Sequence, residues 1–204
     1  VQTIEKSAFS GCTGLTGVIL PDTLEVLGAA DGSSGSVFNG CSGLEFVRTA
    51  NSEESTVFEL PDSLKAIGKQ TFKDAFSAGM DVKVVIPESV ETIGSEAFYS
   101  GRISQIVIKR QGDGWDSNYT GYDSKAFHTG NSSLLIIFND DRSYQDYKLN
   151  CSPTSTSRNA MTHPLTIRFG DTGIRQEKLN YQSIQYTRIE GTDFWEKDTA
   201  YTLP

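Results

Sequence analysis

Hydrophobic and polar positions recur in a fixed order along the first two thirds of the chain. The clearest copy is Ile93-Gly94-Ser95-Glu96-Ala97-Phe98, in which an aliphatic residue opens the pattern and a small residue precedes Phe. Similar stretches run from Ile4 to Phe9, from Leu27 to Phe38 with six extra residues, from Ile67 to Phe72, and from Tyr122 to Phe127. Such recurrence indicates a repeat protein whose units stack on one another.

The residues between these stretches predict three parts for each unit. An extended apolar run comes first, and the examples are 15–20, 81–86 and 103–108. A turn then begins at Pro21, Pro61 or Pro87, because Pro cannot donate a hydrogen bond to a sheet. The return segment has apolar residues three apart, as in Leu24 and Leu27, and we expect it to be loosely helical.

The length of the repeat narrows the fold class. The spacings between successive repeat Phe residues are 29, 34, 26 and 29, and removing the visible insertions leaves a unit in the twenties. That length is typical of leucine-rich-type repeats and shorter than all-helical repeats. We therefore expect a right-handed solenoid of about five coils, with short parallel β-strands and irregular, 3-10 or short helical returns. Gly at 28, 68 and 94 follows each return and is expected to supply a backbone turn.

Three polar insertions interrupt the repeat, and the repeat does not reach the end of the chain. The insertions are 29–34, 50–56 and 109–121, and the second is predicted to split 44–49 from 57–60, as a hairpin. Residues 1–150 are predicted to be the solenoid, closed after the strand 133–138 by a short helix at 139–148. A Ser/Thr-rich linker (151–164) and a small β segment (165–204, with strands at 165–169, 183–189 and 200–203) are expected to follow.

The charge of the chain excludes some partners. The formal net charge is −8, and residues 1–150 account for it with 12 basic and 20 acidic residues, since 151–204 hold six of each. An acidic body without a basic cluster argues against nucleic acid and anionic membrane as partners. No apolar run approaches the roughly 20 residues that a membrane-spanning helix needs. The chain opens at Val1 within a repeat, and we expect it to be a trimmed or mature fragment.

The three cysteines, Cys12, Cys41 and Cys151, form no CxxC pair, and their odd number argues against a disulfide framework. Cys12 and Cys41 each follow a repeat Phe by three positions, where the other units have small residues: Ala75, Gly101 and Gly130. We expect this position to hold a small buried side chain, a role that free Cys suits. A disulfide between Cys12 and Cys41 in neighbouring coils is the alternative.

Spacings typical of catalytic and metal sites are missing from the sequence. His128 and His163 form no H-x-x-x-H pair, no G-x-S-x-G stretch occurs, and Gly112-x-Gly114 lacks the strand and helix of a phosphate loop. Asp113–Asn118 has alternating oxygen ligands but lacks the Glu of a calcium-binding EF-hand loop. We therefore expect no catalysis, no cofactor and no metal.

Aromatic residues in the 109–121 insertion are candidates for binding. Trp115 and Tyr119 could contact a protein or a sugar, or pack the loop onto the coil below. Tyr122 takes the place of the opening aliphatic residue of the repeat and is predicted to be in the core.

A second set of candidates lies on the strands. If Leu15, Val18 and Leu20 point inward, Ile19 points outward, and its equivalents are Val85, Val107 and Ile137, with Arg48 or Glu59 in the second unit. This outward row is more apolar than a free sheet face needs. Strand propensity of β-branched residues explains it in one interpretation; a cover from the C-terminal segment or a docked partner explains it in the others. If the row is exposed, replacing Val85 and Val107 with Lys should weaken partner binding and leave the melting temperature nearly unchanged.

Two stretches carry a family resemblance. Phe9-Ser-Gly-Cys-Thr-Gly-Leu15, continuing to Leu20-Pro-Asp-Thr-Leu24, and Pro87-Glu-Ser-Val-Glu-Thr-Ile-Gly-Ser-Glu-Ala-Phe98 resemble the BspA-like leucine-rich repeats of bacterial surface proteins. The resemblance covers roughly residues 1–150, and this chain departs from it in its irregular spacing and long insertions. It implies export to the bacterial surface and a role in adhesion or host-protein binding.

These observations lead to one main hypothesis and two alternatives. The main hypothesis is a non-enzymatic, secreted or cell-surface module that binds a protein partner through the sheet face or the insertions. Its candidate residues are Ile19, Val85, Val107, Ile137, Trp115 and Tyr119. The alternatives are a carbohydrate-binding surface centred on the 109–121 loop and a structural spacer that displays other domains.

Overall fold

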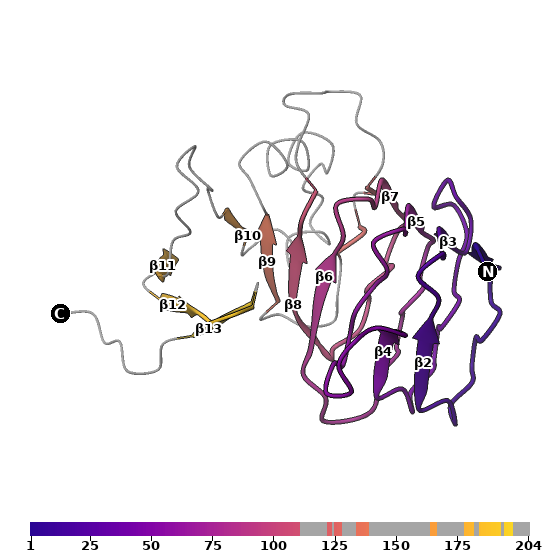
Figure 1. Ribbon diagram of the computed structural model, residues 1–204, viewed down its shortest axis with the longest axis horizontal. Helices are drawn as coiled ribbons and strands as arrows, with labels where there is room; N and C mark the ends of the chain where they lie inside the picture. Colours follow the sequence, from indigo (N-terminus) through magenta and orange to yellow (C-terminus); the bar gives the residue numbers. More distant parts are fainter. Residues whose placement is uncertain are drawn as a thin grey trace.

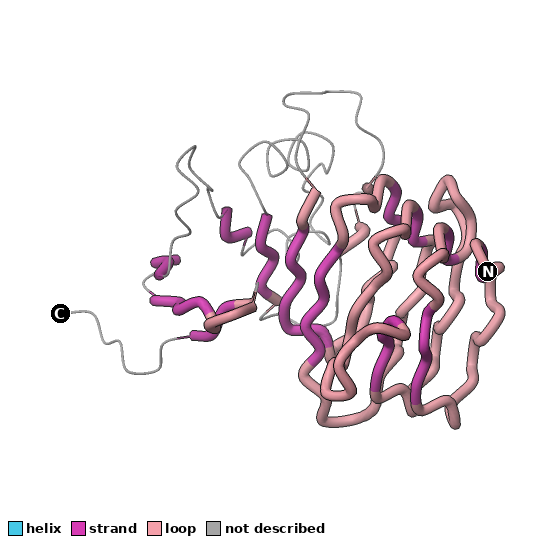
Figure 2. Tube along the Cα trace, viewed as in Figure 1, coloured by secondary structure: helices cyan, strands magenta, loops and turns pink. Residues whose placement is uncertain are grey.

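The computed structural model describes residues 1–110, 122–123, 125–127, 134–138, 164–166, 178–181, 184–192 and 194–197. The chain in these ranges forms strands joined by turns, with no helix among the described residues (Figures 1 and 2). The strands are β1 (Thr3–Ile4), β2 (Gly17–Leu20), β3 (Val26–Leu27), β4 (Phe46–Thr49), β5 (Ala66–Ile67), β6 (Val82–Ile86), β7 (Thr92–Ile93), β8 (Ile103–Ile108), β9 (Leu135–Phe138), β10 (Pro164–Thr166), β11 (Lys178–Tyr181), β12 (Ile184–Arg188) and β13 (Trp195–Lys197).

The return segments form one parallel sheet in the order β1-β3-β5-β7. The opening residues of the repeat lie side by side in it: Ile4 pairs with Leu27, Leu27 with Ile67, Ile67 with Ile93, and Ile93 bridges to Tyr122. This confirms the repeat alignment and the leucine-rich-repeat type of solenoid. Tyr122 is buried, as predicted.

The predicted helical character of the returns is wrong for the described residues. Leu24 N–H donates to Pro21 O at 3.0 Å, which closes a turn, and a two-residue strand follows. Gly28 N–H then donates to Ile4 O of the neighbouring coil at 2.8 Å, rather than to its own segment. The apolar spacing of three therefore arises from a turn plus a strand, because the backbone finds its partners in a neighbouring coil.

The repeat Phe side chains form a continuous stack inside the solenoid. Ring centroids of Phe9 and Phe38, and of Phe38 and Phe72, are 5.5 Å apart, and the stack continues through Phe98 to Phe127 at 5.7 and 6.4 Å. The four later rings are fully buried, whereas Phe9 is 38% exposed because it lies in the first coil. The stack confirms the shared core that the repeat predicted.

In the repeat turns around the Phe stack, the hydrogen bonds that join one coil to the next run in one direction. Alternate residues of each turn donate N–H to the next coil: Ser7, Phe9 and Gly11 to Gly35, Val37 and Asn39, and Ser36, Phe38 and Gly40 to Lys69, Thr71 and Lys73. The peptide groups between them close local turns, as Ala8 N–H does with Glu5 O at 3.2 Å. The residue two before Phe has positive φ in four coils, namely Ser7, Ser36, Gln70 and Glu96.

The longer strands form the opposite face of the stack. β2 pairs with β4, and β6, β8, β9 and β10 form a second sheet, all in parallel (Figure 1). β2 and β6 end immediately before Pro21 and Pro87, as the sequence predicted. β10 lies beyond residue 150 yet extends this sheet, and the boundaries of the linker and the C-terminal segment stay a prediction.

The second unit contributes two parallel runs, so the predicted hairpin is wrong. Val47 in β4 bridges in parallel to Phe58, and the insertion 50–56 carries the chain back to the start of the face. Residues 57–60 are thus an extra run between β4 and β6. Phe58 and Phe76 fill the interior beside them, with ring centroids 5.3 and 6.2 Å from that of Phe72.

The insertion 29–34 lies flat across the neighbouring coils. Its Gly32 O accepts a hydrogen bond from Lys69 N–H at 3.1 Å. A Cβ at Gly68 would lie 2.1 Å from Ser34 O, and one at Gly94 would lie 2.3 Å from Gly32 O. Of the three return glycines only Gly28 has positive φ, so Gly68 and Gly94 serve close backbone approach rather than the predicted turn.

The position three residues after each repeat Phe, which the sequence predicted to hold a small buried side chain, is not buried in every unit. Cys41 and Ala75 are buried and Cys41 is a free thiol, but Cys12 is an exposed free thiol in the first coil. In the fourth unit Ser100 takes this position, since it is buried and its Oγ donates to Ala75 O at 2.9 Å, while Gly101 is exposed. Gly130 and Cys151 lie outside the described residues.

Candidate functional site

The outward row predicted on the strands exists in register. Ile19 pairs with Arg48, and Val85, Val107 and Ile137 pair in succession across β6, β8 and β9. The second unit supplies both sequence candidates, because the bridge of Val47 to Phe58 places Glu59 next to Arg48.

Burial divides this row into two halves. Ile19 is 59% exposed and Val85 is half-buried, but Val107 is 6% and Ile137 1% exposed. The row is therefore open to solvent at Ile19 but covered at Val107 and Ile137. A partner could reach those two residues only if this half of the face opened.

The open half carries an apolar and cationic surface, which we call the Ile19 patch: Ile19, Phe46, Arg48 and Val57. Phe46 lies opposite Gly17, and its ring occupies the space where a Cβ at Gly17 would be, within 2.1 Å. The Arg48 guanidinium lies 4.4 Å from the centroid of the Phe46 ring and also donates to Glu54 O. Val57 is 36% exposed. Sequence reasoning missed Phe46, although Gly17 at the equivalent position left room for a ring.

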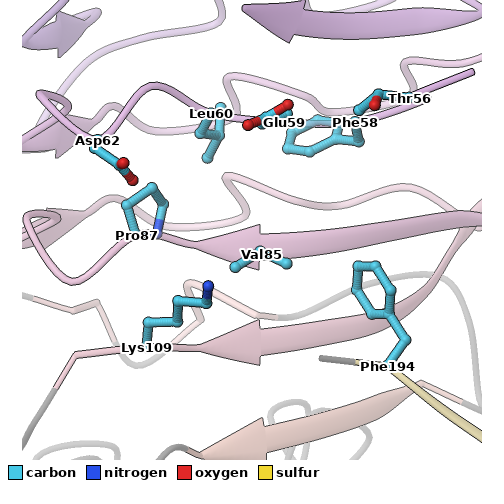
Figure 3. Close-up of a pocket in the computed structure, with 9 residues that line it drawn as sticks. All are labelled: Thr56, Phe58, Glu59, Leu60, Asp62, Val85, Pro87, Lys109 and Phe194. Atoms are coloured by element: carbon cyan, nitrogen blue, oxygen red, sulfur yellow. The ribbon is translucent and has the colours of Figure 1, made fainter. Parts of the chain in front are cut away.

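A hollow of about 210 Å³ adjoins the Ile19 patch. Figure 3 shows Val85 between residues of the extra run on one side and Lys109 and Phe194 on the other. Phe58, Leu60, Val85, Pro87 and Phe194 give it apolar walls, and Thr56, Glu59, Asp62 and Lys109 give it a polar rim.

Phe194 comes from the C-terminal part of the chain. It precedes β13, which pairs antiparallel with β12. Its ring centroid lies 5.8 Å from Lys83 Nζ, at cation–π distance, and the ring lines the hollow with Val85. A residue far along the chain therefore lies against the outer face of the solenoid, as one interpretation of the apolar row required.

The ion pairs of the described residues join neighbouring coils. Lys65 Nζ lies 2.7 Å from Glu25 Oε2, and Lys73 Nζ lies 2.9 Å from Glu96 Oε2. The hydrogen bond to each Glu raises the pKa of its Lys partner. None of these four residues lines the hollow, so the pairs hold coils together rather than form a site.

The remaining candidates are not placed by the structure. Trp115, Tyr119 and the 113–118 loop lie outside the described residues. Within the described ranges, no group of three or more His, Cys, Asp and Glu side chains is arranged to hold a metal ion. The same ranges contain no helix long and apolar enough to cross a membrane.

Comparisons with known proteins add relatives to this geometry. In structural comparison, the chain is similar to a leucine-rich repeat protein of T. pallidum at 24% identity and a TM-score of 0.39, over 67% of this chain and 62% of that one. It is also similar to a leucine-rich cell surface protein of Faecalibacterium prausnitzii A2-165 at 15% identity and a TM-score of 0.33, over 96% of this chain and 48% of that one. The chain thus spans less than two thirds of either structure. A search of curated proteins found no match.

The family model described as BspA type leucine rich repeat region matches residues 1–52 and 50–157, with six copies. These residues hold the return sheet, the Phe stack and the strands β2 to β9. The chain belongs to the BspA-type leucine-rich-repeat family.

Proposed function

We propose that this chain is a non-catalytic recognition module of the bacterial surface or the extracellular space, and that it binds a protein partner through the Ile19 patch. The observation that supports this most is the composition of the patch. An exposed Ile, a Phe with an Arg stacked on it and an exposed Val lie together on the outer face of the solenoid. Aromatic and Arg side chains dominate the binding energy of protein interfaces.

The rest of the face directs the proposal to the N-terminal half. Val107 and Ile137 are closed off, so an incoming partner meets Ile19 and Phe46 first. Family membership agrees with this proposal, because the resemblance noted in the sequence implies adhesion or host-protein binding at the bacterial surface. Binding through a flat sheet face also suits an extended repeat surface.

The test is binding of the purified chain to a panel of immobilised extracellular-matrix proteins, measured by surface plasmon resonance. For a matrix protein that binds, Ile19→Lys and Val57→Lys should each weaken affinity at least about tenfold, because a charge replaces a desolvated apolar contact. Thr13→Lys is the matched control, since it adds the same charge at an exposed turn.

Equal losses in Ile19→Lys and Thr13→Lys would show that only net charge matters and would contradict the proposal. A glycan array supplies the second arm. Binding to a glycan that disappears in Trp115→Ala and survives in Ile19→Lys would replace the protein-binding proposal with the carbohydrate alternative.

A further inference from the structure

The outer face of the solenoid is interrupted between residues 57–60 and β6, and we call this interruption the seam. Val57 O and Glu59 N–H bond to Val47 in β4, at 2.8 and 2.7 Å. Because peptide groups alternate in direction along an extended chain, those of Phe58 and Leu60 face the seam.

The other side of the seam follows from the pairing of β6. Val82 N–H donates to Arg102 O at 2.8 Å, and Ile86 O accepts from Lys109 N–H at 3.0 Å. Residues 82, 84 and 86 thus bond toward β8, and the peptide groups of Lys83 and Val85 face Phe58 and Leu60.

No backbone hydrogen bond between the described residues crosses the seam. The cause is the extra run. β4 follows the turn that contains Phe38, and β6 follows the turn that contains Phe72. The rings of these two residues are only 5.5 Å apart, so the two turns are direct neighbours. On the outer face, however, residues 57–60 lie between β4 and β6. Phe58 and Leu60 are buried, and unpaired buried peptide groups are costly, so the seam favours a ligand that supplies donors and acceptors.

The hollow lies on this seam, because residues from both of its sides line it. Its volume of about 210 Å³ is below the roughly 300–1,000 Å³ of pockets that enclose whole small ligands. Apolar walls of this size suit one side chain. Unpaired peptide groups beside a side-chain pocket are the two features by which proteins bind extended peptides.

The charged residues at the rim of the hollow favour a positively charged ligand. Glu59 and Asp62 lie along one side and Lys109 on the other, so the rim carries two carboxylates against one ammonium group. The solenoid around it is acidic as well. Both favour basic residues next to the apolar one.

We propose that the seam and its hollow bind an extended peptide segment that alternates apolar and basic residues, with one apolar side chain in the hollow and its backbone bonded to the seam. This deepens the proposed function by naming the kind of segment that a protein partner would present. It concerns the hollow, whereas the recognition proposal concerns the Ile19 patch.

The probe is the acetylated and amidated peptide Lys-Leu-Lys-Val-Lys, with Lys-Gly-Lys-Gly-Lys as the charge-matched control. Addition of the first peptide should shift the amide NMR signals of Phe58, Leu60, Lys83 and Val85 and slow their hydrogen exchange about tenfold. Val85→Phe fills the hollow and should weaken binding about tenfold, while Thr13→Phe, at an exposed turn that does not line the hollow, should not.

Equal binding of the two peptides would overturn the proposal, since it would reflect charge alone. Equal binding to wild type and a folded Val85→Phe variant would also overturn it, as would seam amides already protected in the free protein. If Val85→Phe does not fold, the double variant Glu59→Gln, Asp62→Asn is the test. It should weaken binding of the Leu-containing peptide severalfold, because it removes both carboxylates from the rim. Unchanged binding would contradict the proposal.

A loss of peptide binding in Val85→Phe together with unchanged binding of a matrix protein would separate the two proposals. If instead the peptide binds at the seam while Ile19→Lys leaves matrix binding intact, the recognition proposal fails and the seam stands.

Discussion

At some positions of this solenoid only Gly fits, because another segment of the chain crosses directly over it. Gly68 and Gly94 have ordinary φ values, but Ser34 O and Gly32 O lie where their side chains would begin. Gly101 is also a repeat glycine, and a Cβ there would meet nothing within 4 Å. The same residue type is therefore required at one position and free at another. The difference lies in the backbone that crosses it, which is the insertion 29–34 at Gly68 and the insertion together with Lys69 at Gly94.

We expect Gly68→Ala and Gly94→Ala each to lower the free energy of unfolding by about 1–3 kcal/mol, because backbone atoms must move to admit the methyl group. Gly101→Ala is the control and should change it by less than about 0.5 kcal/mol. Urea denaturation followed by circular dichroism measures all three. Equal effects at the three positions would show that the insertion does not hold these glycines in contact.

The thiols of Cys12 and Cys41 should differ in reactivity with pH. Burial raises the pKa of the Cys41 thiol, whereas Cys12 is exposed. Iodoacetamide at pH 8 should modify Cys12 at least about tenfold faster than Cys41, because the thiolate is the reactive form. Peptide mass mapping after a time course gives both rates, and comparable rates would place Cys41 at the surface.

The same pKa shift predicts a stability effect. A thiol whose pKa is higher in the folded state stabilises the fold below its unfolded pKa of about 8.5 and loses that contribution as pH rises above it. The difference in unfolding free energy between wild type and Cys41→Ala should therefore narrow from pH 8 to pH 10. A constant difference would mean that Cys41 does not titrate differently on unfolding.

At the level of elements, the outer strands behave differently along the stack. β2 leaves Ile19 open to solvent, whereas β8 and β9 bury the equivalent Val107 and Ile137. Burial reverses the sequence-based expectation that Lys at position 107 leaves the melting temperature unchanged.

We now expect Val107→Lys to destabilise the protein by about 3–4 kcal/mol, because it buries an unpaired charge. Ile19→Lys should cost less than about 0.5 kcal/mol, since its side chain is in water. Thermal denaturation of both variants at pH 7 tests this. A small effect of Val107→Lys would show that the cover over β8 separates easily.

The strands show where sequence reasoning succeeds. The column from Ile4 to Tyr122 was predictable because four members lie five residues before their Phe, and Leu27 does so once the six inserted residues are removed. The extra run 57–60 was not. Two apolar runs joined by a mostly polar insertion of seven residues fit a hairpin or a parallel return equally well, and only the three-dimensional path decides.

The site was harder to predict than the fold. Alternation identified the outward direction of Ile19 and Val85, but not which of the equivalent residues were covered. Phe194 lies over the face from more than a hundred residues along the chain and leaves no local pattern near Val85. Phe46 was missed for a related reason, since its space comes from Gly17 in another coil.

At the scale of the whole molecule, the Phe stack predicts a gradient of stability. Phe72 contacts rings on both sides and is fully buried, whereas Phe9 has a ring neighbour on one side only. Phe72→Ala should lower the unfolding free energy by about 3–5 kcal/mol, and Phe9→Ala by about 1–2 kcal/mol.

Chemical denaturation measures this difference, and native-state hydrogen exchange locates it. Amides of the first coil should exchange faster than those around Phe72, since stability in a repeat protein is a sum of neighbour contacts. A single exchange free energy throughout residues 1–110 would show that the solenoid opens only as one unit.

The one-way hydrogen bonds on the Phe side have an electrical consequence. In ordinary sheets the peptide dipoles of neighbouring groups point oppositely and cancel. Here the alternate groups of the repeat turns, from Ser7 to Asp74, point toward the next coil, and they outnumber the groups of Lys69, Phe76 and Ser77, which donate to the preceding coil. Their moments add along the long axis, as they do in an α-helix, and leave outward carbonyl oxygens as a partial negative pole at the first coil. The Phe side of that coil will therefore attract cations and hydrogen-bond donors and repel anions.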